Sequence, residues 1–184
     1  MNQLRLLKVR LKVLAIFVRD VIQNIYFRFP RKGKDRLDVA YSIDLEQPFF
    51  PSETLSDKIY NLRVAAESIN AFVMQPDDLF SFWHIIGNPN KPGKFRKGRI
   101  IKNGELALEV GGGLCQVSGI IYHIALIAGL KIVERHNHSV DIYTESDRYT
   151  PLGTDATVAY GYKDLRIVNS YPFPIQFKLT VEAT

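Results

Sequence analysis

The sequence predicts an α+β domain in which a central helix carrying Cys115 packs on an antiparallel sheet. In residues 117–128 apolar side chains recur at spacings of three and four, the period of a helix with one buried face. Gly129 ends this run, as is typical of the residue just beyond a helix C-terminus. Residues 130–143 then alternate and are rich in β-branched side chains, which predicts a strand.

The chain is long enough for one sizeable core, because 46% of its 184 residues are hydrophobic. We expect a basic amphipathic helix with its linker at residues 1–36 and a single domain at residues 37–184. The first part holds ten Lys and Arg residues against two acidic ones, whereas the second part is mildly acidic. Cys115 is the single cysteine, so an intrachain disulfide is excluded.

The N-terminal helix is predicted from apolar residues that fall on one face at helical spacing. They are Leu7, Leu11, Leu14, Val18, Val21, Ile22 and Ile25. The longest uncharged run before Arg19 is residues 13–18, which is too short to span a bilayer and short for a signal-peptide core. Two interpretations stay open: the helix lies on an anionic membrane surface, or it packs on the domain with its charges solvated.

These features predict a cytoplasmic protein, with the inner membrane surface as an alternative place of contact. A nucleic-acid partner is not expected, because the basic residues are not interleaved with stacking aromatics and no nucleic-acid motif is present.

Between this helix and the cysteine, the sequence predicts a loop, a helix and a hairpin in turn. Pro48 and Pro51 indicate a loop in residues 38–56, and residues 56–70 have the apolar period of a helix with Ser56 as its N-cap. Asn103 and Gly104 are typical of a two-residue hairpin turn between strands at 99–102 and 105–110.

Aromatic residues follow a predicted turn at residues 76–78. Among them Trp83 is a candidate wall of a binding pocket, and His84 is interpreted as an ordinary histidine at the edge of a loop. Residues 86–98 are rich in glycine and proline, which indicates a flexible loop that could gate a site.

The C-terminal part is predicted to be rich in strands. Residues 156–160 and 165–168 have strand composition around a turn at 161–164, and residues 175–181 resemble a last strand. Asp155 opens the first of these strands. If that strand pairs with the one carrying His138, Asp155 reaches the imidazole; otherwise it caps the turn after Gly153.

Cys115 follows three successive glycines and begins the predicted helix. The unpaired N–H groups and the positive end of a helix dipole stabilise a thiolate there, and the same N–H groups could hold an oxyanion. Gly112, Gly113 and Gln116 are the candidate contacts at this helix start. The alternative interpretation is that Cys115 is a small buried hydrophobic residue with no chemistry.

Two histidines follow the helix at positions 136 and 138. Side chains alternate along a strand, so His136 and His138 would lie on one face and both could face Cys115. One cysteine and two histidines would suit zinc, with Asp155 nearby. The commoner arrangement has one catalytic and one structural histidine, so we expect no metal and no other cofactor.

The run from Asn61 to Tyr171 resembles the VanW family, which is named for an accessory protein of glycopeptide-resistance gene clusters. The matching segments are NLRVAAESIN at 61–70, FSFWHIIG at 80–87, GGGLCQVSGIIYHIAL at 111–126, ERHNHS at 134–139 and PLGTDATVAYGYKDLRIVN at 151–169. The resemblance implies a role in cell-envelope or antibiotic-resistance biology, with a cell-wall-type peptide or precursor as partner.

The order of a glycine-led cysteine at a helix start, a histidine and an aspartate is also similar to the transglutaminase-like core of the papain-like superfamily. That resemblance implies Cys115 as nucleophile, His138 as general base and acid, and Asp155 as the orienting carboxylate. Trp83, His136, Gln116 and the glycines would then contact substrate or the oxyanion.

The expected function is therefore a thiol acyl-transfer enzyme: a peptidase, an amidase or a transpeptidase. The alternatives are a non-catalytic module that binds peptidoglycan or a partner, and a zinc-dependent hydrolase.

Overall fold

The computed structural model describes residues 3–33, 37, 40–49, 51–102, 105–138 and 151–182. Its helices and antiparallel sheets confirm the predicted α+β class. The elements are α1 (Gln3–Ile22), η1 (Tyr26–Arg28), β1 (Arg31–Lys32), α2 (Leu55–Asn70), β2 (Phe72–Val73), β3 (Leu79–Ser81), α3 (Phe82–Ile86), β4 (Lys97–Lys102), β5 (Glu105–Val110), α4 (Leu114–Ile127), β6 (Lys131–Glu134) and β7 (Arg166–Val168).

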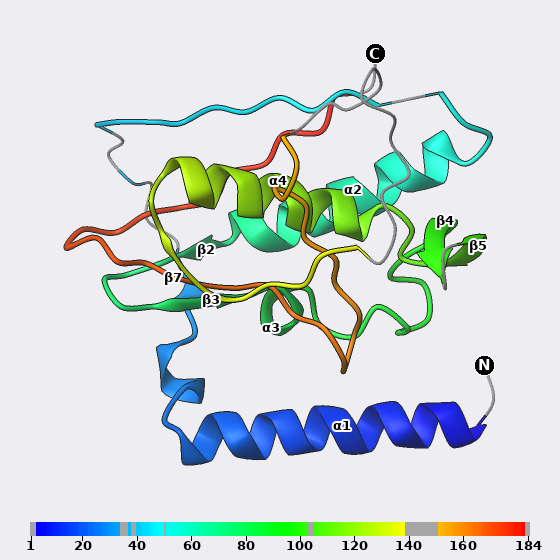
Figure 1. Cartoon of the computed structure of the whole chain (residues 1–184), viewed down its shortest axis with the longest axis horizontal. Helices are drawn as coiled ribbons and strands as arrows, with labels where there is room; N and C mark the ends of the chain where they lie inside the picture. Colours follow the sequence, from blue (N-terminus) through cyan, green and yellow to red (C-terminus); the bar gives the residue numbers. More distant parts are fainter. Residues whose placement is uncertain are drawn as a thin grey trace.

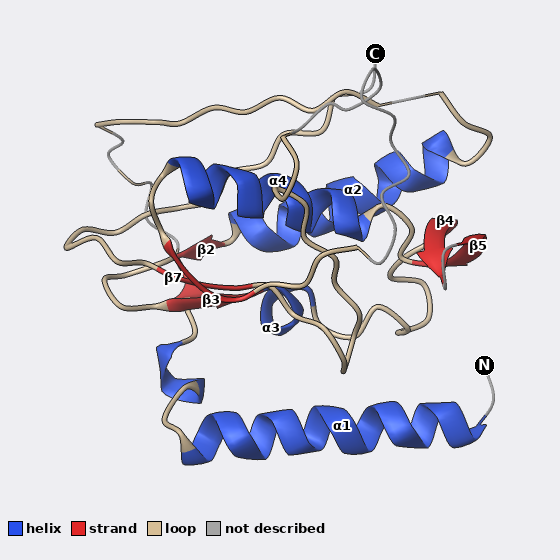
Figure 2. Ribbon diagram, in the orientation of Figure 1, coloured by secondary structure: helices blue, strands red, loops and turns tan. Residues whose placement is uncertain are grey.

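The main layers are a helix pair and a small sheet. Figure 1 shows α2 and α4 on one side of the antiparallel sheet β3–β7–β6, and α1 on the opposite side. Ile69 of α2, Ile121 of α4, and Phe80 and Ile167 of the sheet are almost completely buried in one core. The cysteine helix thus packs on an antiparallel sheet, as the apolar period of residues 117–128 predicts. Figure 2 shows how much of the remaining chain is loop.

The C-terminus of α4 forms a Schellman motif. Gly129 has a positive φ of 66°, and its N–H donates to the carbonyl of Leu126, while the N–H of Leu130 donates to Ala125. These two bonds satisfy carbonyls that the helix leaves open, so the chain turns directly into β6. The predicted role of Gly129 is confirmed.

The N-terminus of α4 depends on a close approach between two backbones. A Cβ on Gly112 would lie 2.3 Å from the carbonyl carbon of Gly98 in β4, so that only glycine fits. Gly113 is the N-cap, with a left-handed φ of 100°. The side-chain amide of Asn61 in α2 donates to the carbonyls of Gly112 and Arg96, at 2.9 and 3.0 Å. The hairpin, α2 and the cysteine loop are therefore fixed together.

The hairpin predicted before the cysteine is confirmed. Strands β4 and β5 pair antiparallel from Lys97 opposite Val110 to Lys102 opposite Glu105. The turn residues 103 and 104 lie outside the described part of the chain. Helix α2 begins at Leu55 with Thr54 as N-cap, so the prediction of Ser56 as the cap is wrong by two residues.

Of the three predicted C-terminal strands, the one at residues 165–168 is confirmed as β7, whereas the other two are wrong. Among the described residues, 156–160 form an isolated bridge at Ala159 with Lys163, and 175–181 form one at Ile175 with Met74. In residues 175–181 a side chain forms backbone hydrogen bonds that a neighbouring strand would otherwise form. The Asn70 amide donates to the carbonyl of Leu179 and its oxygen accepts the Leu179 N–H, at 2.9 and 2.8 Å.

The turn at residues 76–78 is confirmed, with Asp77 at a positive φ of 66°. The interpretation of His84 is wrong, because this residue lies inside α3 rather than at a loop edge. Its ring stacks on Phe29, with the centroids 4.0 Å apart. His84 thereby ties the segment after α1 to the domain.

Helix α1 packs on the domain with a different face from the one predicted. Its inward residues include Val9 and Val13, which lie against Gly161, and Asp20, which binds Arg166. The predicted apolar face, with Leu11 and Leu14, is exposed instead. The interpretation that the helix packs on the domain with its charges solvated is confirmed, but the packing face differs from the predicted one. No helix in the described part of the chain is both long and apolar enough to cross a membrane.

Candidate functional site

Cys115 is the second residue of α4 and lies in its first turn. The N–H of Leu114 donates to Gly111, and the N–H of Gln116 donates to Gly113. Among the described residues no hydrogen bond from the backbone N–H of Cys115 is found. An open N–H at the positive end of the α4 dipole is the environment in which a thiolate or an oxyanion is stabilised.

The Cys115 side chain is partly buried beneath the segment that follows Asp155. Its Sγ atom lies 3.5 Å from Oγ1 of Thr157 and 3.7 Å from the carbonyl oxygen of Val158. The N–H of Thr157 donates to the carbonyl of His136 at 2.8 Å, which holds this segment beside the histidine segment. Thr157 and Val158 thus form one wall of the site, and neither was singled out from the sequence.

His138 joins Cys115 to Asp155. Its ring Nδ1 lies 2.8 Å from Oδ2 of Asp155, and its backbone N–H donates to the same oxygen at 2.8 Å. The imidazole is also close enough to Cys115 for each group to shift the pKa of the other. Because Nδ1 faces the carboxylate, Nε2 is the nitrogen left for the thiol. The three residues chosen from the sequence therefore lie side by side in space, in the order Cys115, His138, Asp155. We call these three residues the row.

Within the row, Cys115 and His138 shift each other's pKa in opposite directions. Burial raises the pKa of the Cys115 thiol, but its polar neighbours, above all the His138 imidazole, bring the net pKa below the ordinary value. The neighbouring Cys115 thiol raises the pKa of His138 against the effect of burial, and Asp155 raises it further. Opposite shifts of this kind favour a thiolate beside an imidazolium.

Arg135 holds the carboxylate of Asp155 from the other side. Its guanidinium donates to Oδ1 of Asp155 at 2.7 Å, to the Asp155 carbonyl at 2.8 Å and to the Gly153 carbonyl at 3.0 Å. Burial raises the pKa of Asp155, but contacts with His138 and Arg135 leave it below the ordinary value. Sequence reasoning missed Arg135, although it directly follows β6 in the same segment as the histidines.

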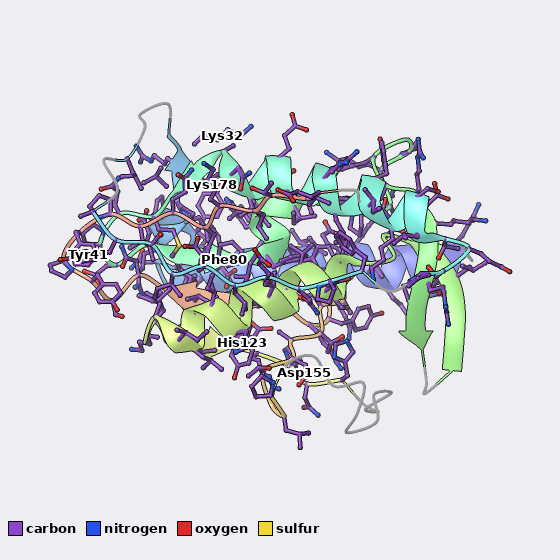
Figure 3. The ribbon with its side chains drawn as sticks, turned by 90° about the horizontal axis from the view of Figure 1, so that it is seen from above. Lys32, Tyr41, Phe80, His123, Asp155 and Lys178 are labelled. Atoms are coloured by element: carbon purple, nitrogen blue, oxygen red, sulfur yellow. The ribbon has the colours of Figure 1, made fainter. Side chains whose placement is uncertain are left out.

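The site lies on the outer side of the cysteine helix. Figure 3 shows Asp155 on the side of α4 that faces away from α2. Side chains of His138 and Asp155 are 27% and 38% exposed, so solvent or a ligand reaches the row from this side.

His136 does not face Cys115, and the prediction that both histidines share one face is wrong. Its Nε2 lies 3.0 Å from Oε1 of Glu134, and the same oxygen accepts the N–H of Asp164 at 3.0 Å. The strand β6 ends at Glu134, so the alternation of a strand does not extend to the histidines. The described residues contain no group of three His, Cys, Asp or Glu side chains arranged to hold a metal ion.

The other candidate contacts have structural partners. The Gln116 amide is directed at the Pro48 carbonyl, 3.5 Å away, and the Trp83 indole donates to the Lys163 carbonyl at 2.7 Å. Gly112 and Gly113 shape the loop that leads into α4, as described above. Within the described part of the chain, neither Gln116 nor Trp83 hydrogen-bonds to Cys115 or His138.

Comparison with known proteins gives the family. A family model described as "VanW like protein" matches residues 57–184. The chain is 31% identical over 126 residues to the vancomycin B-type resistance protein VanW of Enterococcus faecalis, covering 68% of this chain and 46% of that protein. It is 38% identical over 127 residues to the uncharacterized protein YoaR of Bacillus subtilis, covering 69% of this chain and 40% of that protein.

The chain thus spans less than half the length of these curated relatives. No solved structure matches significantly, so the transglutaminase-like core stays a prediction. The matched region begins in α2 and contains Cys115, His138 and Asp155. On the strength of the family model and of both relatives, this chain belongs to the VanW family.

Proposed function

We propose that this protein is a thiol-dependent acyl-transfer enzyme that acts on a peptide amide of the cell-wall type. The observation that carries the proposal is the row Cys115, His138 and Asp155 at the open N-terminus of α4. A nucleophile, a base that contacts it and a carboxylate that orients the base are the parts that covalent catalysis requires.

The reaction follows from the positions of these atoms. The Cys115 thiolate attacks the carbonyl carbon, a C–S bond forms, and the negative charge on oxygen lies near the open N–H of Cys115. The His138 imidazolium gives its proton to the amide nitrogen, the C–N bond breaks and an amine leaves. Water or an acceptor amine then attacks the thioester, His138 takes its proton, and the C–S bond breaks to release the product.

The substrate class rests on the family rather than on the site. One relative is named for vancomycin resistance, which supports a peptide of the cell wall or its precursor as the acyl donor. The side chains of His138 and Asp155 are partly exposed, which supports access of a peptide to these residues. Hydrolysis and transpeptidation differ only in whether water or an amine attacks the thioester.

The first test is the pH dependence of Cys115 alkylation by iodoacetamide, with a chelator present. We expect an apparent thiol pKa below the ordinary value that rises in His138→Ala, since the imidazolium stabilises the thiolate. His136→Ala is the matched control, because His136 contacts Glu134 instead, and its profile should equal that of the wild type. A wild-type thiol that titrates at its ordinary value, or an unchanged profile in His138→Ala, refutes the proposal.

A second candidate is a non-catalytic module that binds the same peptide. It is favoured by the partial burial of Cys115 and by the Val158 carbonyl, which accepts from the protonated thiol. Mass spectrometry of cell-wall peptides incubated with wild type and with Cys115→Ser separates the two. Product formation that is lost in Cys115→Ser, with peptide binding retained, supports the enzyme; binding without turnover in both proteins supports the module.

A further inference from the structure

Helix α1 has two apolar faces, and the domain covers one of them. On the inward face, Val9 and Val13 approach Gly161 so closely that a Cβ there would lie 3.3 Å from either side chain. Near the end of the helix, the buried Asp20 accepts two hydrogen bonds from Arg166, at 3.0 and 2.7 Å. These contacts set the rotation of α1 on the domain, and with it the face that points outward.

The outward face carries a continuous apolar stripe, which we call the outward stripe. Its members recur at three- and four-residue spacings and are each 44% to 75% exposed. They are Leu7, Leu11, Leu14, Val18 and Ile22. A helix of 20 residues is about 30 Å long, so the stripe follows most of one side of the molecule (Figure 1). An apolar strip of this extent on a surface marks an interaction site.

Basic side chains flank the outward stripe. They are Arg5, Lys8, Arg10, Lys12 and Arg19, and all are exposed. Asp20 is the one acidic residue of α1, and it is buried against Arg166. The exposed surface of α1 therefore combines apolar and positively charged groups, with the neutral Gln3 at its first position.

This charge pattern distinguishes two possible binding partners of the outward stripe: a second copy of the chain and a lipid surface. A second copy of the chain would bring like charges together along the whole helix, which destabilises the contact. An anionic lipid surface offers hydrocarbon for the stripe and negative headgroups for the flanking Lys and Arg residues. Because the helix lies along one side of the domain, its stripe can enter a membrane surface while the domain stays in water (Figure 1).

We propose that α1 is an interfacial helix that lies flat on an anionic lipid surface through the outward stripe. The inward contacts with Gly161 and Arg166 keep the domain attached and fix its orientation above the lipid. This inference is independent of the chemistry proposed for Cys115, because α4, which contains that residue, lies across the sheet from α1 (Figure 1).

The test is co-sedimentation of the full chain with vesicles of phosphatidylcholine alone and of an equimolar mixture with phosphatidylglycerol. We expect partitioning onto the mixed vesicles, weakened by salt. Leu11→Ser/Leu14→Ser should lower the partition coefficient about tenfold or more, because two apolar side chains no longer enter the lipid. The matched control is Leu126→Ser/Ile127→Ser, an exposed pair at the end of α4, which should bind as the wild type does.

A second variant tests the charges without changing the stripe. Lys8→Glu/Arg10→Glu alters exposed positions on either flank and should lower binding to the mixed vesicles by about tenfold or more. The rate of Cys115 alkylation should stay at the wild-type value in each variant, which reports an intact fold and an intact site. Loss of activity with retained vesicle binding would therefore contradict the proposed function but not this inference.

Three results would overturn the inference. One is a wild-type chain that fails to bind the mixed vesicles; another is a Leu11→Ser/Leu14→Ser variant that binds them as the wild type does. The third is a wild-type dimer in sedimentation velocity that the same variant abolishes, with no vesicle binding, since a second copy would then occupy the stripe.

Discussion

His138 contacts one oxygen of Asp155 twice, because its backbone N–H and its ring Nδ1 both lie 2.8 Å from Oδ2. The backbone contact fixes the position of the His138 main chain, and the ring contact fixes the orientation of its imidazole. A single carboxylate oxygen thus positions His138 toward Cys115, and Arg135 occupies the other oxygen. This arrangement makes the site sensitive to changes that never touch the thiol.

Asp155→Asn should weaken the activation of Cys115. The carboxylate favours the imidazolium, so without its charge the pKa of His138 falls and the pKa of the thiol rises. We expect slower alkylation at neutral pH and, if the proposed chemistry holds, acyl transfer reduced about 10²- to 10⁴-fold. The measurement is the pH profile of alkylation, with Asp44→Asn on the exposed segment before α2 as control. An unchanged profile would show that Asp155 only caps the local turn.

Arg135→Met should affect the site through Asp155. The variant keeps an apolar side chain but loses the bonds to Oδ1, to the Asp155 carbonyl and to the Gly153 carbonyl, and with them the guanidinium that lies over the Tyr122 ring. Loss of these charged hydrogen bonds should lower the free energy of unfolding by about 1.5–3 kcal/mol and slow Cys115 alkylation at neutral pH. Urea denaturation and alkylation rates measure the two effects. Arg63→Met, at an exposed position of α2, should change neither.

Asp20→Ala should strongly destabilise the docking of α1. The side chains of Asp20 and Arg166 are 4% and 6% exposed. Removing the Asp20 carboxylate therefore leaves the buried charge of Arg166 with fewer hydrogen-bond partners. Such losses cost about 3–5 kcal/mol, whereas the exposed pair Asp57 and Arg96 contributes about 0–1 kcal/mol. Denaturation of Asp20→Ala beside Asp57→Ala measures the difference. Equal effects of the two variants would contradict the prediction.

The same ion pair predicts a loss of stability in acid. Burial raises the pKa of Asp20, but Arg166 and Arg19 leave it below the ordinary value in the folded protein. A group whose folded pKa is lowered contributes stability above its unfolded pKa, about 3.9, and that contribution disappears as pH falls through the folded pKa. The stability difference between wild type and Asp20→Ala should therefore be full at neutral pH and shrink in strong acid. A difference that does not change with pH would exclude this linkage.

Gly112→Ala should disrupt the loop before Cys115, because the added Cβ would lie 2.3 Å from the Gly98 carbonyl carbon. The overlap is with backbone, which cannot rotate away, so we expect a loss of about 3 kcal/mol or more. Gly119→Ala is the matched control inside α4. Its Cβ would come no closer than 3.9 Å to Ala156, so the helix should gain about 0.5–1 kcal/mol. Thermal denaturation should thus move in opposite directions for the two variants.

Local patterns in the sequence predicted most of the helical architecture. Both α2 and α4 lie where apolar residues recur with the helical period, and the hairpin lies on either side of Asn103 and Gly104. These features depend on residues within about four positions of each other, so they can be read directly from the sequence. The predicted strand at 165–168 is present as β7, but the one at 175–181 is not, because the Asn70 side chain, more than 100 residues away, takes the bonds of Leu179.

By itself, the sequence determined that a cysteine begins a helix, that histidines follow it after a short turn, and that an aspartate comes later. It did not determine which histidine meets the thiol, because β6 ends before both of them and side-chain alternation no longer applies. Only the tertiary structure places the His136 ring against Glu134 and the His138 ring near Cys115. Likewise, α1 has two apolar faces of similar period, and the pairing of Asp20 with Arg166, 146 residues apart in the chain, decided which one points outward. Periodicity is a local property, whereas the choice of a partner depends on backbone segments that meet only when the chain folds.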